Sequence, residues 1–115
     1  MTRRKIEQIA KELGWNIEFF IACGNKWVNL SKPSPAGQDF NAEFVYISLD
    51  HFLEDLYNYW ENYDPSQEAY YWLDCSGHGK NGAPYEMGDV YNDMVACESN
   101  LKELYDALLS AESIA

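Results

Sequence analysis

One amphipathic segment, from Leu49 to Leu73, constrains the fold more than any other part of the chain. Its first half carries large apolar residues at steps of three and four, which place them on one helical face: Leu49, Phe52, Leu53, Leu56, Trp60 and Tyr63. Carboxylates fall off that face at Asp50, Glu54, Asp55 and Glu61. Asp64-Pro65 breaks the helix, and the aromatic run from Ala69 to Leu73 is typical of a strand. The segment therefore predicts a core helix with an acidic outer surface, followed by a short strand.

The residues before this segment predict one helix and three strands. The helix covers residues 2–13, where four apolar residues form one stripe: Ile6, Ile9, Ala10 and Leu13. Three stretches then have the pattern of strands: 15–22, 27–31 and 40–47. The prolines and glycine of residues 32–39 predict a loop. Short connections favour an antiparallel meander for these three strands.

The chain becomes helical again from Met87 to Leu109. Seven residues step alternately by three and four: Met87, Val90, Met94, Cys97, Leu101, Leu104 and Leu108. That is three heptads of a/d spacing. We interpret it as a helix packed across a sheet, because sustained coiled coils usually have longer runs. The alternative is a helix pair in a homodimer.

Together these elements predict a two-layer α+β sandwich with the order α-β-β-β-α-β-α. Its sheet is mostly antiparallel, its helices cover one face, and residues 1–115 form a single domain. A chain of this length can bury roughly 65% of its unfolded surface, which is enough for a core without disulfides.

The charge of the chain is divided unevenly along the sequence. The net charge is −11, but residues 1–32 carry six basic residues against three acidic ones. Residues 33–115 carry two basic residues against sixteen acidic ones. Such a surface repels nucleic acid and attracts a basic protein surface. We therefore expect a basic protein as partner and no direct binding to nucleic acid.

The cysteines and the lengths of the apolar runs indicate where in the cell the protein is located. Three widely spaced cysteines, Cys23, Cys75 and Cys97, do not form a disulfide framework and suit a reducing cytoplasm. The first residues lack the apolar centre of a signal peptide, and no apolar run approaches the length of a membrane span. We expect a cytoplasmic protein that does not enter a membrane.

Residues 74–84 are where an enzyme would show its chemistry. Cys75 and His78 provide half of a zinc-ligand spacing, and the second half is missing. Gly77 to Gly82 is rich in glycine, but its lysine is at the wrong position for a phosphate-binding loop. We predict no catalytic residues, no metal and no cofactor. A cysteine hydrolase or a metal enzyme built on this loop is the third-ranked alternative.

Four short motifs carry a resemblance that covers about residues 27–109. They are Ser34-Pro35-Ala36-Gly37-Gln38-Asp39-Phe40, Phe52-Leu53-Glu54-Asp55-Leu56, Tyr63-Asp64-Pro65 and Gly82-Ala83-Pro84. In this order they resemble segments of small uncharacterised proteins of bacteriophages and integrative elements of gut Firmicutes. The resemblance implies a cytoplasmic accessory protein of a mobile element. Small acidic proteins from that context include inhibitors of host restriction and CRISPR systems, so an inhibitor is implied by class and not by residues.

Our leading hypothesis is a small, acidic, non-enzymatic protein that docks on a basic, nucleic-acid-binding protein surface. The alternative is a self-associating structural or regulatory subunit. We expect the protein to be a monomer or a homodimer through its last helix. The candidate partner-binding residues are acids one helical turn apart or in line on the two later helices: Asp50, Glu54, Glu61, Asp89 and Asp93. Asp50 and Glu54 lie about 6 Å apart along a helix axis, which is comparable to neighbouring phosphates of one nucleic-acid strand.

Overall fold

The computed structural model describes residues 1–74 and 87–114. Its elements, in chain order, are α1 (Arg3–Glu12), β1 (Asn16–Ala22), β2 (Asn25–Pro33), β3 (Asp39–Val45), the short 3-10 helix η1 (Leu49–His51), α2 (Phe52–Glu61), α3 (Pro65–Asp74) and α4 (Met87–Ile114). The strands form one antiparallel sheet in the order β1-β2-β3. The predicted α+β class is therefore confirmed, and so are the first helix, the three-stranded meander and the two later helices.

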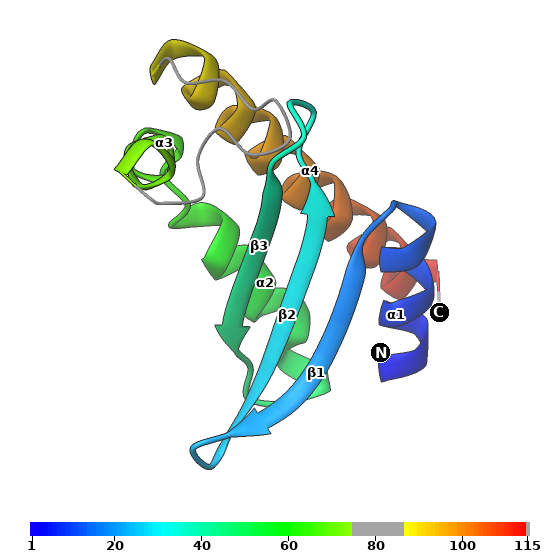
Figure 1. Ribbon diagram of the computed structural model, residues 1–115. Helices are drawn as coiled ribbons and strands as arrows, with labels where there is room; N and C mark the ends of the chain where they lie inside the picture. Colours follow the sequence, from blue (N-terminus) through cyan, green and yellow to red (C-terminus); the bar gives the residue numbers. More distant parts are fainter. Residues whose placement is uncertain (75–86, 115) are drawn as a thin grey trace.

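Local sequence explains how the sheet begins. Thr2 caps α1 by accepting a hydrogen bond from the Lys5 amide at 3.2 Å. Gly14 follows with a φ of +87°, a conformation that glycine adopts without strain. Cys23 and Gly24 both have positive φ and make the tight connection between β1 and β2. The chain thus reverses twice within its first quarter, which brings α1 beside β1 (Figure 1).

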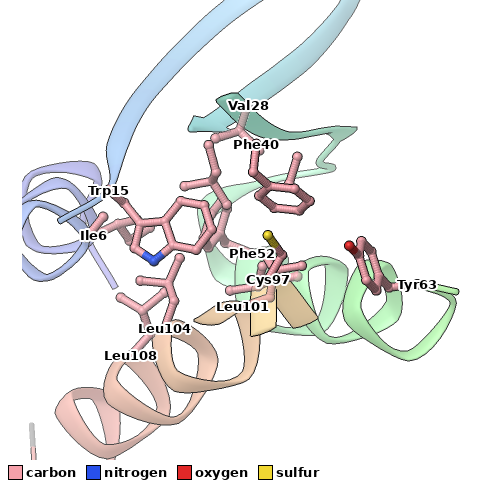
Figure 2. Packing of buried hydrophobic residues seen from close by; sticks show 14 of the residues in the cluster. Ile6, Trp15, Val28, Phe40, Phe52, Tyr63, Cys97, Leu101, Leu104 and Leu108 are labelled. Atoms are coloured by element: carbon pink, nitrogen blue, oxygen red, sulfur yellow. The ribbon is translucent and has the colours of Figure 1, made fainter. Parts of the chain in front are cut away.

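The helices cover one face of the sheet. In Figure 1, α2 and α4 cross behind the three strands. The strand residues that point to this side are buried, among them Val28, Leu30, Phe40 and Ala42. Figure 2 shows the resulting core, in which the indole of Trp15 lies over Leu104 and Leu108, and Cys97 points from α4 toward the sheet.

From Val90 on, the a/d residues of α4 are buried in the core of the same chain. Val90, Met94, Cys97, Leu101, Leu104 and Leu108 are each at most 1% exposed. Their neighbours in the core come from α1, α2, α3 and the sheet. The interpretation of α4 as a helix packed across the sheet is confirmed. The same burial leaves these residues unavailable for the seam of a helix pair.

The predicted fourth strand is wrong, because Ala69 to Leu73 lies within the helix α3. Asp64 Oδ1 accepts hydrogen bonds from the amides of Ser66 and Gln67, so Asp64 is the N-cap of this helix. Pro65 occupies the first helical position, where a missing N–H is harmless. The Asp64-Pro65 pair therefore ends α2 and also starts α3. The aromatic side chains were weaker evidence for a strand than this start signal was for a helix.

No helix within the described ranges is long and apolar enough to cross a membrane.

Candidate partner-binding groove

The structure separates the five predicted partner-binding acids. Glu54, Glu61 and Asp89 are exposed, and so is Asp50, which lies in η1 just before α2 begins. Asp93 is only 5% exposed. The four others remain candidates for a partner surface, whereas the expectation that Asp93 belongs to a surface array is wrong.

Asp93 instead holds the loop between β2 and β3 against α4. Its carboxylate accepts hydrogen bonds from the Ser34 hydroxyl at 2.5 Å and from the Ala36 amide at 3.0 Å. The same Ser34 Oγ accepts from the Gln38 amide at 2.9 Å. A buried carboxylate is tolerated here because its hydrogen bonds replace water. Asp93 is therefore a structural residue that joins segments 59 positions apart.

A groove of about 390 Å³ lies between β3, α2 and the start of α3; we call it the edge groove. Carboxylates and amides supply its polar lining: Asp55, Asn58, Asn62, Asp64, Gln67 and Glu68. Its apolar wall consists of Phe44, Val45, Tyr59 and Tyr63. The rings of Phe44 and Tyr59 stack with centroids 5.4 Å apart, which gives the groove a firm base.

The helical repeat explains why these side chains meet. On α2, Phe52 and Leu56 point into the core, and Asp55, Asn58 and Asn62 follow each other at steps of three and four along the flank beside β3. The cap residue Asp64 and Glu68, one turn later on α3, close the far end. The two helices and the Asp64 cap therefore contribute three carboxylates to one groove, and the strand edge contributes part of its apolar wall.

Among the residues that the structure describes, no basic side chain lines the edge groove to balance these carboxylates. Asp55 Oδ2 accepts a hydrogen bond from the Ile47 amide at 3.1 Å, and Asp64 is occupied as the cap of α3. The two ion pairs found in the described part of the chain, Arg3–Glu7 and Lys102–Asp106, lie on other surfaces. The groove is therefore a concentrated negative site.

Burial perturbs the acids of this groove. Desolvation, with the nearby Asp64 charge as the second cause, raises the pKa of Glu68 above its ordinary value of 4.5. Burial and the Glu68 charge raise the pKa of Tyr59 to about 12. Both pKa values are raised because these groups are partly buried beside other carboxylates. A positively charged group that entered the groove would lower both pKa values.

The free edge of β3 borders the same groove. The Tyr46 amide donates to the Lys26 carbonyl at 3.0 Å, just beyond the last pair of the β2–β3 ladder. In an antiparallel pair, the residues that bond to the neighbour alternate with residues whose groups point away. The amides and carbonyls of Asn41, Glu43 and Val45 therefore point away from β2. No backbone partner for them is found among residues 1–74 and 87–114.

The remaining candidates for chemistry give no assembled site in the described ranges. No three His, Cys, Asp or Glu side chains there converge as metal ligands. Cys97 is free, and burial, with Asp93 as the second cause, raises the pKa of its thiol to about 12. Cys23 is free and exposed. Cys75 and His78, the basis of the enzyme alternative, lie outside the described residues.

Comparisons with protein-family models, with curated proteins and with solved structures find no match to this chain.

Sequence reasoning missed Asp64 and Glu68 as members of one site. Asp55 was recognised as an acid off the core face of the helix, but Asp64 was interpreted as part of a turn. The signal was present in the run Asp64-Pro65-Ser66-Gln67-Glu68, which has a cap residue, a proline at the first position and an acid in the first turn. Once that run is understood as a helix start, Asp64 and Glu68 share one end of α3.

Proposed function

We propose that this protein is a small, non-enzymatic binding protein whose edge groove receives a positively charged segment of a partner protein. The observation that carries the proposal is a groove lined by Asp55, Asp64 and Glu68, with no basic residue among its described lining. A net charge of −11 extends this field beyond the groove and would steer a basic partner toward it. The same field repels nucleic acid, so the partner is a protein.

The resemblance to proteins of mobile elements supports a narrower proposal. In that setting, the basic partner would be a nucleic-acid-binding protein of the host, and this protein would act as an accessory factor or inhibitor in the cytoplasm. A self-associating subunit has less support, because the a/d residues of α4 are already buried within the chain.

The test compares two triple variants that remove the same amount of charge. One neutralises the groove through Asp55→Asn, Asp64→Asn and Glu68→Gln. Asparagine keeps the cap of α3, because it is as good an N-cap as aspartate. The control neutralises exposed acids through Glu54→Gln, Glu61→Gln and Asp89→Asn. Binding of a synthetic lysine-rich peptide is measured by titration calorimetry at 50 and 300 mM NaCl.

We expect the groove variant to weaken binding at 50 mM NaCl by about tenfold or more, since a few weakened charge contacts amount to about 1.4 kcal/mol or more. The control variant should weaken binding less. Raising the salt concentration should weaken peptide binding most for the native protein, which keeps all of its charges. Equal losses in both variants would assign binding to the general charge or to the predicted acidic helix faces. The absence of lysine-peptide binding at both salt concentrations would refute the proposed function.

A further inference from the structure

We infer that the partner segment binds in extended form, as an added strand along the free edge of β3, with basic side chains at alternate positions entering the edge groove. This inference rests on the proposed function and specifies how the partner is held. It combines the backbone groups of the strand edge with the charge of the groove beneath it.

The edge of β3 has the geometry for strand addition. Asn41, Glu43 and Val45 direct amides and carbonyls away from β2, and none is bonded within the described part of the chain. Their spacing at every second residue, roughly 6.8 Å, matches the repeat of an added strand. An open strand edge is a template for pairing with another chain, which several peptide-binding domains use.

Three of the usual protections of a strand edge, a bulge, a proline and a lysine, are missing from β3. Its pairing with β2 runs without a bulge from Pro33↔Asp39 to Trp27↔Val45. The strand DFNAEFV contains neither proline nor lysine. Its charged residues, Asp39 and Glu43, are acidic and lie on the open face of the sheet, where they add to the negative field that favours a basic strand over an acidic one. An edge of this kind remains available to a partner of the opposite charge.

The side-chain alternation of an added strand brings its charges to the groove. Residues of the new strand that lie opposite Phe44 share its face and point toward α2, where Asp55 and Tyr59 line the groove. The aliphatic stem of a lysine there would pack on the Phe44 and Tyr59 rings, while its ammonium group reaches the carboxylates. A residue opposite Glu43 lies on the open face of the sheet. The occupant is therefore an extended segment with lysine or arginine at every second position.

A second copy of this chain is a poorer occupant. Two copies would bring together two surfaces of net charge −11. Symmetric antiparallel pairing centred on Glu43 would place this residue opposite its own copy, and like charges directly opposite are destabilising. Charge complementarity therefore favours a basic partner over self-pairing.

The test uses two peptides of identical composition with the native protein. In one, lysine and threonine alternate (Thr-Lys-Thr-Lys-Thr-Lys-Thr), and in the other the lysines are contiguous (Thr-Thr-Lys-Lys-Lys-Thr-Thr). Amide hydrogen exchange of β3 is measured by NMR with and without each peptide. We expect the alternating peptide to bind about tenfold more tightly and to slow exchange at Asn41, Glu43 and Val45 by about tenfold or more, because one or two added hydrogen bonds amount to about 1.4 kcal/mol. Exchange at Ala42 and Phe44, whose amides already face β2, should change little.

A pair of variants at Glu43 supports this measurement. Glu43→Pro removes one outward amide without removing a backbone hydrogen bond to β2, although it also removes the carboxylate that accepts a hydrogen bond from the Asn29 side chain at 2.9 Å. Glu43→Gln removes the same charge while keeping the amide and a side-chain oxygen that can accept from Asn29. We expect Glu43→Pro to bind the alternating peptide about tenfold more weakly than Glu43→Gln. If the peptides bind equally and exchange along β3 is unchanged, strand addition is refuted and the proposed function stands. Slowed exchange at these amides without peptide, together with a dimeric mass, would assign the edge to a second copy and overturn the inference.

Discussion

At the scale of single residues, two aspartates on one helix have different roles in this protein: one is a surface charge and the other holds a loop. Asp89 and Asp93 are one turn apart on α4, yet Asp89 is exposed and Asp93 is 5% exposed. Sequence spacing alone treats them as equal members of an array. Their burial differs because a loop from a distant part of the chain covers Asp93, and the Ser34 hydroxyl and Ala36 amide of that loop donate to its carboxylate.

Replacing Asp93 should therefore destabilise the fold. Asp93→Ala leaves the Ser34 hydroxyl and the Ala36 amide without their acceptor, and we expect a loss of about 2–4 kcal/mol of unfolding free energy. Asp89→Ala is the matched control and should change stability by no more than about 0.5 kcal/mol. Urea unfolding followed by tryptophan fluorescence measures both. Equal stability of the two variants would show that the loop does not depend on Asp93.

Glu68 should lower stability at neutral pH. Its pKa is raised in the folded protein, so folding favours the protonated form. The stability that Glu68 contributes is fully present below pH 4.5 and is lost as the pH rises through the folded pKa. We expect Glu68→Gln to have a higher melting temperature than the native protein at pH 7, with the difference disappearing below pH 4.5. The control Glu54→Gln removes an exposed acid and should not reproduce this pH dependence.

At the scale of elements, periodic patterns predicted most of the fold. In β1 to β3 the apolar residues alternate, and in α1, α2 and α4 they form stripes. These residues all face one core, so the residues that the sequence period marks as apolar are also the buried ones. Residues 65–73 lack such agreement, because the aromatic side chains Tyr70 and Tyr71 are exposed and no single face dominates. There the helix start at Asp64 was the deciding signal. The edge groove could not be predicted, because it requires knowing which flank of α2 lies beside β3.

The cap of α3 can be tested on the same grounds. Asp64→Ala removes the acceptor for the amides of Ser66 and Gln67, and we expect a loss of about 1 kcal/mol. Asp64→Asn keeps an oxygen at this position and should retain most of the stability. Thermal unfolding followed by circular dichroism compares the two. If the alanine variant is as stable as the asparagine variant, Asp64 does not stabilise α3 as its N-cap.

At the scale of the whole molecule, charge opposes compaction. Residues 33–115 carry sixteen acidic and two basic residues, and one of those two, Lys102, pairs with Asp106. Most negative charges therefore have no cation beside them within the described ranges. The fold is stabilised by its apolar core against this repulsion.

Salt should therefore stabilise this protein. We expect the melting temperature to rise between 10 and 200 mM NaCl at pH 7, because the screening length falls from about 30 Å toward about 8 Å over that range. The triple groove variant, which lacks three of the acids, should show a smaller rise. A melting temperature that is constant or falls over this range would mean that the acids are already dispersed or paired.

The packing of α4 against α1 and the sheet also sets an order of events during synthesis. Leu101, Leu104 and Leu108 share a core with Ile6 and Trp15, so α1 and the start of β1 acquire this part of their cover only when α4 exists. At translation rates of about 5–20 residues per second, the apolar surface that α4 covers stays open to water for several seconds. The nascent β3 edge, unpaired on its outer side, is then the part of the chain most exposed to pairing with a neighbour.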